Sequence, residues 1–387
     1  MKEIVVLGST GSIGRNCLAV AREFSSAFRI VGLATGSNVD ALAEQVEEFR
    51  PEVVSIAQEA AAEEFSKRHA ASGLRVLSGT EGLRELARWK RSQMIVNGLV
   101  GAIGLVPTVE AIEAGKDVAL ANKESMVLAG ELVMSLARAR GSTVLPIDSE
   151  HCGIHQCLVG RSAGIRRIVL TASGGPFLNR EPDELRDVTP EEVMQHPVWN
   201  MGRRICVDSA TLLNKGFELM EARWFFGVEL SSLGVLIHPQ CAIHAMVEFA
   251  DGTALAQVSR ADMRIPILYA MSYPETVDTR FESSDLPCVG PLTFAEPDLE
   301  RFPCLRLAYS AARAGGTVPA FLNAADEVAV AAFLERRIRF TDIIRVLEGS
   351  LERLAGTPAT SVEGVLRADG EARIVAREIV TGIAASS

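Results

Sequence analysis

A glycine-rich turn close to the amino end constrains the fold of this chain more than any other segment. Residues 4–7 form a short apolar, β-branched run, and the sequence GSTGSIG follows at positions 8–14. Helical periodicity begins directly afterwards, over residues 16–23. Glycines with this G-x-x-G-x-x-G spacing allow a tight turn, and the free N–H groups of the following helix can receive a pyrophosphate. Because the turn lies between a first strand and a first helix, it predicts a dinucleotide-binding unit.

The pattern beyond this turn predicts a parallel sheet. Short β-branched runs alternate with helical stretches, and such alternation is typical of βαβ units covered by helices. The strand-like runs are residues 4–7, 29–34, 53–56, 94–97, 118–120 and 143–147. We therefore expect an α/β fold in which residues 1–147 form an N-terminal Rossmann-like domain.

The rest of the chain divides into three further segments. Residues 148–273 mix strand-like runs at 168–170 and 254–258 with Gly-, Pro- and Asn-rich loops, which predicts a central α+β catalytic domain. Residues 274–303 contain several prolines and are expected to be a linker laid over the surface. Residues 304–387 predict a C-terminal helical bundle, with helices over 305–314, 320–336, 342–354 and 362–384 and N-caps at Thr341 and Ser361.

Composition limits the class of protein. A length of 387 residues suits two or three domains. The net charge of -10 argues against nucleic-acid partners, because these require a basic surface. The seven cysteines are scattered and never form C-x-x-C, which is typical of reduced thiols in the cytoplasm. Residues 4–7 leave no room for a leader peptide, and no stretch approaches the roughly 18 apolar residues of a membrane helix. We expect a cytoplasmic protein with no membrane partner.

The end of the second strand-like run indicates which dinucleotide binds. An NAD site usually has an Asp or Glu there, whose carboxylate binds the ribose 2′-hydroxyl. Here the sequence is ATGSN at positions 34–38, which contains no acid and also no Arg or Lys. Because a carboxylate would repel a 2′-phosphate, the absence of an acid favours NADPH.

Two polar clusters are candidates for a metal and an anion site. Asp148 and Glu150 follow the last strand-like run, and carboxylates two residues apart on extended backbone point to the same side, where they can chelate a cation. Asn214, Lys215 and Glu218 share one face of a predicted helix, so Glu218 can complete the cation site. Oxygen ligands suit magnesium or manganese. The alternatives are a solvated turn for the first cluster and an exposed amphipathic face for the second.

Three more segments have the composition of binding loops. The sequence ASGGPF at 172–177 offers hydroxyl and backbone donors to an anion. The sequence HPVWNMG at 196–202 combines a titratable His, a large aromatic residue and a terminal Gly, as in a lid. The sequence ANKES at 121–125 follows a strand, at the edge where open α/β sheets bind ligands.

Together, and in this order, these segments closely resemble the 1-deoxy-D-xylulose 5-phosphate reductoisomerase family. The resemblance covers nearly the whole chain and rests on GSTGSIG, LANKES, PIDSEH, ASGGPF, HPVWNMG, VDSATLLNKGFE, EARWFF, IHPQCAIHAMVEF, ADMRIPI and LNAADEVAVAAFL. It implies an NADPH-dependent oxidoreductase that isomerises and reduces 1-deoxy-D-xylulose 5-phosphate to 2-C-methyl-D-erythritol 4-phosphate, in the non-mevalonate (MEP) pathway of isoprene biosynthesis. It also implies Mg²⁺ or Mn²⁺, with Co²⁺ as an alternative, a phosphosugar substrate, a homodimer and inhibition by fosmidomycin.

The resemblance also assigns the site residues. The implied catalytic residues are Lys123, Asp148, Glu150, His196 and Glu218, and the implied metal ligands are Asp148, Glu150 and Glu218. The implied NADPH contacts are Thr10, Gly11, Ser12, Ile13, Gly36, Ser37, Asn38, Asn122, Glu124 and Gly202. The implied substrate contacts are Lys123, Ser149, Glu150, Ser173, His196, Ser209, Asn214, Lys215 and Glu218, and the phosphate would be held mainly by Ser173, Ser209, Asn214 and Lys215. The flap would include Trp199 and Met201, and the residues that line or support the site would be His151, His244 and Met263.

Several positions depart from the family pattern, and those in the phosphate-site block, at positions where we expect packing residues, are Cys206, Leu212, Leu213 and Phe217. Ser37 stands where some members have Lys, which would weaken the grip on the 2′-phosphate, and Asp326 stands where Asn is common. Two other functions remain as alternatives. A semialdehyde dehydrogenase, another NADP-dependent oxidoreductase, needs a nucleophilic Cys beside a base, for which Cys152 next to His151 is the candidate. A non-catalytic NADP-sensing protein would bind its ligand without a metal.

Overall fold

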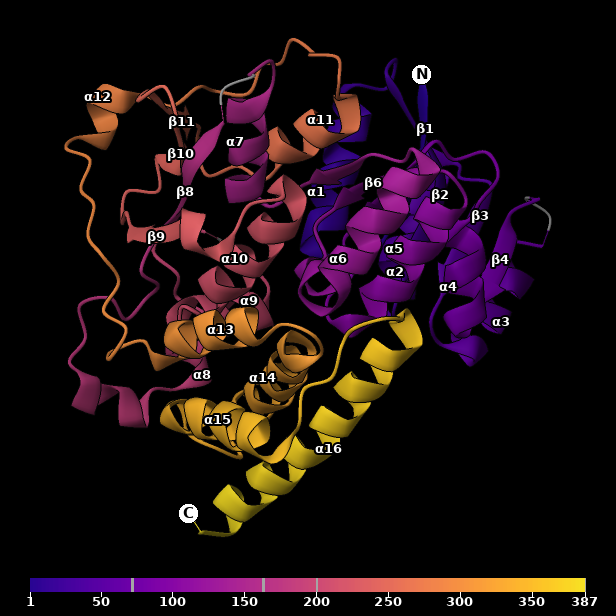
Figure 1. Cartoon of the computed structure of the whole chain (residues 1–387). Helices are drawn as coiled ribbons and strands as arrows, with labels where there is room; N and C mark the ends of the chain where they lie inside the picture. Colours follow the sequence, from indigo (N-terminus) through magenta and orange to yellow (C-terminus); the bar gives the residue numbers. More distant parts are fainter. Residues whose placement is uncertain (71–72, 162–163, 200, 387) are drawn as a thin grey trace. The chain divides into compact units, whose positions relative to one another are not determined.

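The computed structural model describes residues 1–70, 73–161, 164–199 and 201–386. These residues form two compact units (Figure 1). Unit 1 comprises Met1–Ser125, Val133–Cys152 and Asp262–Phe281, and unit 2 comprises Met126–Leu132, Gly153–Ala261 and Glu282–Ser387. The four-part division into 1–147, 148–273, 274–303 and 304–387 stays a prediction.

Unit 1 is built on a parallel sheet of seven strands in the order β4-β3-β2-β1-β5-β6-β7. The strands are β1 (Lys2–Leu7), β2 (Phe28–Thr35), β3 (Val53–Ile56), β4 (Arg75–Ser78), β5 (Met94–Asn97), β6 (Asp117–Leu120) and β7 (Val144–Pro146). Every strand-like run expected up to residue 147 overlaps one of them, so the predicted Rossmann-like α/β fold is confirmed. Strand β4 was not predicted, because its side chains are exposed or half-buried and it lacks the apolar run of an interior strand.

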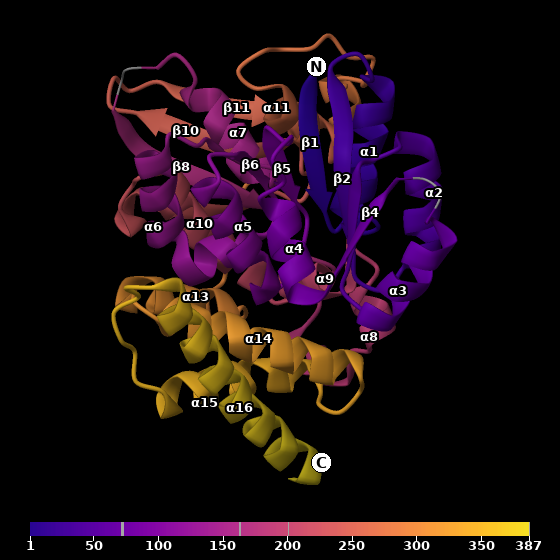
Figure 2. The same cartoon turned by 90° about the vertical axis from the view of Figure 1, so that its right-hand side faces the viewer.

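Helices cover both faces of this sheet (Figures 1 and 2). Ile4 and Val6 of β1 face a core shared with helices α1 (Ser12–Glu23), α2 (Val39–Phe49), α3 (Glu59–Arg68) and α11 (Arg264–Ser272). Val5 points to the opposite face, toward Leu86 of α4 (Gly79–Ala87). There a Cβ added to Gly32 would lie 2.9 Å from Val5 and 2.8 Å from Leu86. Because alternate residues of each inner strand are buried on opposite faces, the strands read as continuous apolar runs.

Unit 2 contains a mixed sheet of four strands in the order β11-β10-β8-β9. The strands are β8 (Ile165–Ala172), β9 (Leu233–Ile237), β10 (Ile243–Phe249) and β11 (Ala254–Val258), which confirms the runs expected at 168–170 and 254–258. Ile168 of β8 and Val235 of β9 pack in one core with Leu219 of helix α10 (Leu213–Phe226). The sheet thereby fixes the position of α10, which carries one of the predicted polar clusters.

Unit 2 ends in four helices: α13 (Pro303–Ala314), α14 (Val318–Leu334), α15 (Ile343–Arg353) and α16 (Val362–Ser386). Each overlaps a helix expected from periodicity. The predicted N-cap Ser361 is confirmed, because its hydroxyl accepts a hydrogen bond from the Gly364 N–H at 3.1 Å. The predicted N-cap Thr341 is wrong: it lies inside a short 3₁₀ helix, and Asp342 is the N-cap of α15. The carboxylate of Asp342 accepts from the Arg339 N–H at 3.0 Å, which fixes that 3₁₀ turn ahead of the helix.

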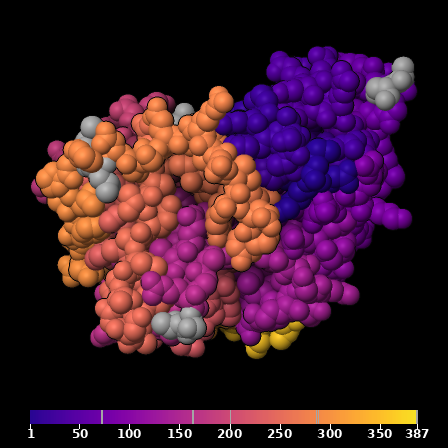
Figure 3. Space-filling view, turned by 90° about the horizontal axis from the view of Figure 1, so that it is seen from above, coloured from indigo at the N-terminus to yellow at the C-terminus, as the bar shows by residue number. Residues whose placement is uncertain are grey.

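The chain between β11 and α13 passes through both units. Helix α11 belongs to unit 1, where the Lys2 ammonium group donates to the Met271 carbonyl at 2.7 Å. Residues 291–296 are all exposed, and Figure 3 shows much of this orange segment on the molecular surface. No helix among the described residues is long and apolar enough to cross a membrane.

Candidate active site

The glycine turn after β1 has the geometry that its sequence predicts. Gly8 has a φ of +78°, and a Cβ added there would lie 2.8 Å from the Gly98 carbonyl oxygen. A Cβ added to Gly14 would lie 2.3 Å from the Gly8 carbonyl oxygen, so both positions exclude any side chain. Helix α1 starts at Ser12, earlier than expected, and its N-cap Gly11 makes no side-chain capping bond. The turn therefore presents a helix N-terminus to an anion.

The predicted ligand-binding segments of unit 1 gather at one edge of the sheet. In a parallel sheet all strands end at the same edge, and here β1, β2, β6 and β7 end at Leu7, Thr35, Leu120 and Pro146. The segments that follow these ends are 10–13, 36–38, 122–124 and 148–150. Strand order also reverses at β1, which lies between β2 and β5, and ligands of open α/β sheets bind at such a point.

The edge near β2 contains a cation that the sequence analysis did not consider. The Thr10 and Thr35 hydroxyls are 2.7 Å apart, so the glycine turn contacts the end of β2. The exposed Arg15 donates from its guanidinium group to the Thr10 carbonyl at 2.9 Å. The residues after β2 contain no Arg or Lys, whereas Arg15 directly follows the glycine motif. Asn38, a predicted NADPH contact, caps α2 through a bond from the Ala41 N–H at 3.2 Å.

Asn122 has a structural role besides the predicted one. Its side chain is 1% exposed and donates to the carbonyls of Leu99 and Gly101, both at 3.0 Å, and to Glu124 at 2.8 Å. Its oxygen accepts from the Ser125 N–H at 3.1 Å and caps helix α6 (Lys123–Arg140). Asn122 thus fixes the loop after β6, and the NADPH contacts assigned to Asn122 and Glu124 stay predictions.

Asp148 and Glu150 lie close together, but for a different reason from the one expected. The sequence predicts extended backbone here, and this is wrong: helix α7 (Ser149–Leu158) starts at the next residue. The Asp148 carbonyl accepts from the Cys152 N–H at 2.8 Å, and its carboxylate accepts from the Glu150 N–H at 3.2 Å. Asp148 therefore caps α7. The cap places a carboxylate oxygen of each acid within 4.8 Å of the other.

A lysine and a histidine lie beside Asp148 in unit 1. Lys123 is 9% exposed, and its ammonium nitrogen lies 3.2 Å from Asp148 Oδ2. His151, which is fully buried, has its Nδ1 3.3 Å from Asp148 Oδ1. The structure thus brings together Lys123, Asp148 and Glu150, with His151, a predicted supporting residue, in contact with Asp148. Met263, another predicted supporting residue, packs against the core of unit 1.

The polar face of α10 in unit 2 is buried. Lys215 is 3% and Glu218 is 1% exposed, so the alternative of an exposed amphipathic face is wrong. The Asn214 amide donates to Glu218 Oε1 at 2.6 Å, and Lys215 forms an ion pair with Glu218 Oε2. The helix begins after Leu212, whose φ of 58° turns the chain sharply out of helix α9 (Arg203–Ala210). Asn214 and Lys215 therefore lie in the first turn of α10, where the helix dipole favours an anion.

The loop after β8 packs directly on the helix that carries Ser209. Gly175 has a φ of +72°, and a Cβ added to it would lie 2.7 Å from the Ser209 carbonyl oxygen. The Ser173 hydroxyl accepts from the Gly175 N–H at 3.0 Å, which shapes this loop. Two of the predicted phosphate-binding serines are therefore on segments in direct contact.

The start of the predicted flap is tied to the same loop. His196 Nε2 lies 2.9 Å from the Ser173 hydroxyl, and His196 Nδ1 accepts from the N–H groups of Val198 and Trp199 at 3.2 and 2.9 Å. Because Nδ1 accepts, the ring proton is on Nε2. Burial lowers the pKa of His196, which favours this neutral form. The Trp199 ring meets His244 edge-on, with 5.9 Å between ring centroids.

The end of the flap leads into α9. Asn200 of the predicted lid lies outside the described residues. The Met201 carbonyl accepts from the Cys206 thiol at 3.8 Å, and Gly202 is the exposed N-cap of α9. The role assigned to Gly202 as an NADPH contact stays a prediction.

The sequence analysis did not identify Arg204, which follows this flap and joins a buried network of charged side chains. Its guanidinium group lies 3.0 Å from Asp326 Oδ2 and 3.1 Å from Glu327 Oε1, both on α14. No local pattern pairs residues so far apart in sequence, so sequence periodicity alone would not have revealed the network.

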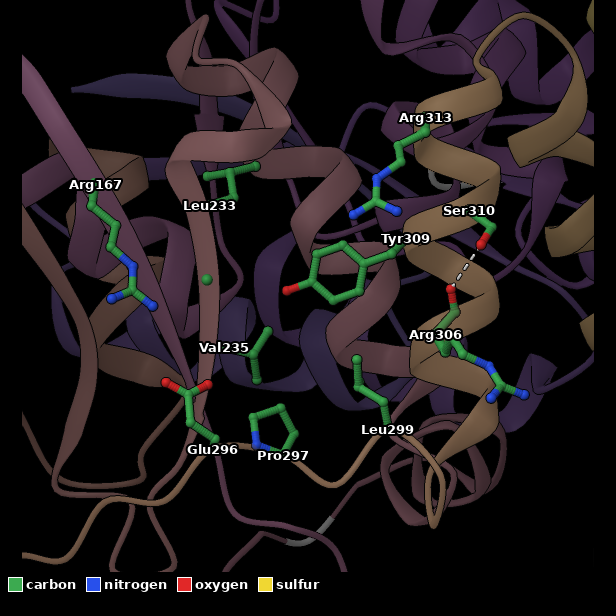
Figure 4. A pocket seen from close by; sticks show the side chains of 11 residues that line it. Arg167, Leu233, Val235, Glu296, Pro297, Leu299, Arg306, Tyr309, Ser310 and Arg313 are labelled. Atoms are coloured by element: carbon green, nitrogen blue, oxygen red, sulfur yellow. Dashed lines mark hydrogen bonds between the residues drawn. The ribbon is translucent and has the colours of Figure 1, made fainter.

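Unit 2 also has a cavity of about 300 Å³ away from these residues. Figure 4 shows it between β9, α13 and the segment that contains Glu296 and Pro297, with Tyr309 pointing into it and Arg306 pointing away. None of its lining residues is a predicted site residue.

Comparisons with known proteins cover nearly the whole chain. The family model described as 1-deoxy-D-xylulose 5-phosphate reductoisomerase matches residues 4–130. Models of the C-terminal domains of the same enzyme match residues 144–226 and 258–375. The 1-deoxy-D-xylulose 5-phosphate reductoisomerase of Chlorobaculum tepidum is 49% identical over 98% of this chain and 100% of its own length.

Solved structures agree with these matches. The 1-deoxy-D-xylulose 5-phosphate reductoisomerase of Zymomonas mobilis in complex with NADPH is 39% identical, with a TM-score of 0.91 over 98% of this chain and 99% of that chain. A DOX-P reductoisomerase in complex with NADPH, fosmidomycin and magnesium is 37% identical, with a TM-score of 0.93 over 98% of both chains. The chain therefore belongs to the 1-deoxy-D-xylulose 5-phosphate reductoisomerase family.

Proposed function

We propose that the residues described above form the active site of an NADPH- and divalent-metal-dependent reductoisomerase. As a member of its family, the chain converts 1-deoxy-D-xylulose 5-phosphate to 2-C-methyl-D-erythritol 4-phosphate with NADPH as reductant. One observation carries the assignment of residues. The glycine turn, Lys123 and the carboxylates Asp148 and Glu150 lie along the same edge of the unit 1 sheet.

The turn after β1 fits a dinucleotide. Its two crowded glycines leave room for the backbone to approach a pyrophosphate, and the N-terminus of α1 faces the same space. Thr10, Gly11, Ser12 and Ile13 supply this cradle, and Gly36, Ser37 and Asn38 receive the adenosine ribose. Arg15 compensates for Ser37 at the 2′-phosphate. NADPH supplies the hydride when bound.

The carboxylates fit a hard divalent cation. Asp148, Glu150 and Glu218 offer oxygen ligands only, which suits magnesium, or manganese or cobalt in its place. When bound, the cation supplies Lewis-acid stabilisation of oxyanions on the substrate. Lys123 adds a fixed positive charge beside Asp148, where it stabilises negative charge that develops on a substrate oxygen.

The substrate phosphate binds to unit 2. Ser173, Ser209 and Asn214 offer neutral donors, and Lys215 supplies the charge at the start of α10. Ser149 and Glu150 contact the sugar. His196, which contacts Ser173, begins the flap that closes over the substrate, and Trp199 and Met201 of this flap exclude water.

The test compares turnover with and without the metal. Oxidation of NADPH by wild-type protein with 1-deoxy-D-xylulose 5-phosphate is followed in EDTA, in magnesium and in manganese. The same assay is run on Glu218→Gln, which retains a hydrogen-bond acceptor for Lys215, and on the exposed control Glu131→Gln. We expect metal-dependent turnover in wild type and control, and loss of turnover in Glu218→Gln with NADPH binding intact. Absence of turnover in folded, metal-supplied wild type would contradict the proposed function.

A semialdehyde dehydrogenase is not favoured. Cys152 is 1% exposed, so its sulfur is inaccessible to a substrate carbonyl. We also propose that the chain acts in the cytoplasm, because its cysteines are scattered and never form C-x-x-C, and as a homodimer, on the basis of the family resemblance. Cell fractionation tests the location. Light scattering tests the dimer, and the mass of a single chain at assay concentration would contradict it.

A further inference from the structure

Arg204 links the predicted substrate site to the C-terminal helices of unit 2. It lies in the first turn of α9, two residues after Gly202, where the predicted flap ends, and the last turn of α9 carries Ser209. Its guanidinium group donates to Asn323 Oδ1 at 2.9 Å and to Asp326 Oδ2 at 3.0 Å. One side chain thus connects the base of the flap to helix α14.

These contacts are well shielded from water. The side chain of Arg204 is 15% exposed and that of Asp326 is 1% exposed. The side chain of Asp208 is 4% exposed, and its Oδ2 lies 3.5 Å from Arg204 Nε. Charge-assisted hydrogen bonds are stronger at such burial, and the planar guanidinium group fixes their directions. The start of α9 is therefore held in one orientation on α14.

The network continues to α16. Glu327 contacts Arg204 through Oε1 at 3.1 Å and Arg373 through Oε2 at 2.7 Å. Arg373 also pairs with Asp369 Oδ2 at 2.7 Å. Helix α14 thus supplies two acids that contact Arg204, and Arg373 of α16 in turn fixes one of them, Glu327.

A shift of α9 would reach both phosphate-binding serines. Gly175 leaves no space against the Ser209 carbonyl, so a movement of α9 toward the loop that carries Ser173 has to displace that loop. Ser173 in turn contacts His196 at the start of the flap. The position of α9 therefore affects Ser209, Ser173 and both ends of the flap.

We propose that Arg204 is a positioning residue for the reaction: its buried contacts with Asn323, Asp326 and Glu327 set the hinge of the flap and the geometry of the phosphate site. The C-terminal helices then act on substrate binding without touching the substrate. This inference rests on the proposed function, because it concerns the same substrate site.

The test separates positioning from folding. KM for 1-deoxy-D-xylulose 5-phosphate, kcat and the Kd for NADPH are measured for Arg204→Gln, for the conservative Arg204→Lys and for Arg203→Gln, an exposed neighbour on the same helix. We expect Arg204→Gln to raise the substrate KM about tenfold or more while the NADPH Kd stays within about twofold. We expect Arg204→Lys to recover most of this loss and Arg203→Gln to match wild type.

A second measurement does not require turnover. Hydrogen exchange of the backbone amides in residues 201–210 is compared between wild type and Arg204→Gln, with residues 8–14 as an internal reference. Faster exchange in 201–210 alone supports the inference. An unchanged substrate KM in Arg204→Gln, or equal losses of substrate and NADPH affinity, would overturn it. If the wild type shows no turnover of 1-deoxy-D-xylulose 5-phosphate while Arg204→Gln still shows faster exchange in 201–210, the proposed function is contradicted and the role of Arg204 in positioning α9 is not.

Discussion

Asp326 is a buried carboxyl group whose protonation is coupled to folding. Burial raises its pKa from 3.8 to about 6, with a further increase from Glu327, while Arg204 and Asp208 act in the opposite direction. Burial also raises the pKa of Asp369, whereas Arg204 and Arg373 outweigh burial and lower the pKa of Glu327. Buried Cys304 of α13 lies within the field of Asp326 as well. Between about pH 4 and about pH 6, Asp326 therefore keeps its proton in the folded chain but has lost it in the unfolded chain.

Asp326→Asn should therefore stabilise the protein at neutral pH. Between about pH 4 and about pH 6 the folded wild type binds more protons at Asp326 than the unfolded chain, so this residue makes the free energy of unfolding fall as pH rises. The variant lacks this pH dependence and should be more stable than wild type above about pH 6, by on the order of 3 kcal/mol. Urea unfolding of both proteins across this pH range measures the difference. A constant difference at all pH values would contradict the role of Asp326 titration.

Asp148 combines two tasks that substitution can separate. As the cap of α7 it needs only an acceptor oxygen, whereas as a proposed metal ligand it needs a charge. In metal-free buffer we expect Asp148→Ala to be less stable than Asp148→Asn by about 1 kcal/mol, the usual size of a lost cap. Both variants should lose metal-dependent turnover. Chemical unfolding measures the difference in stability between the two variants. Equal stability would contradict the capping role of Asp148.

The contact between α10 and α13 shows how packing of elements supports the site. Gly216 lies between Lys215 and Phe217 on α10, and a Cβ added to it would lie 2.3 Å from the Cβ of Ala308 on α13. The absence of a side chain therefore sets how closely these helices approach. Because Lys215 is the next residue, a change in this spacing moves the predicted phosphate site.

Gly216→Ala should overpack this contact. Extra atoms in a packed core usually cost about 1–3 kcal/mol, and we expect a loss of that size in the free energy of unfolding, with a higher KM for the phosphorylated substrate. The double variant Gly216→Ala/Ala308→Gly removes the clash and should recover part of the stability. Denaturant titration of the three proteins checks this. If the double variant is no more stable than Gly216→Ala, the clash is not the cause.

At the scale of the whole molecule, cofactor binding is linked to folding. The glycine turn exists only in folded unit 1, so NADPH should raise the temperature at which half of the protein is unfolded. At a hundredfold excess over its Kd, NADPH should increase the free energy of unfolding by about 2.7 kcal/mol. Arg15 and the absence of an acid after β2 favour the 2′-phosphate, so NADH at equal concentration should have a smaller effect. Thermal unfolding with each cofactor measures this. An equal shift with NADH would contradict the preference.

Much of the architecture was predictable from local patterns. The glycine turn, six of the seven strands of unit 1 and the C-terminal helices all follow from apolar periodicity and turn residues, because these depend on neighbours along the chain. The face shared by Asn214, Lys215 and Glu218 was predictable for the same reason. The family motifs then assigned roles to these residues.

What the sequence by itself determined was therefore the order of elements, the dinucleotide turn and the candidate residues, since each depends on spacing along the chain. Only the tertiary structure decided that Asp148 caps α7, that the face of α10 is buried and that Arg204 meets Asp326 on a distant helix. Burial and long-range ion pairs depend on which elements pack together. That packing results from interactions summed over each unit and cannot be read from any one segment.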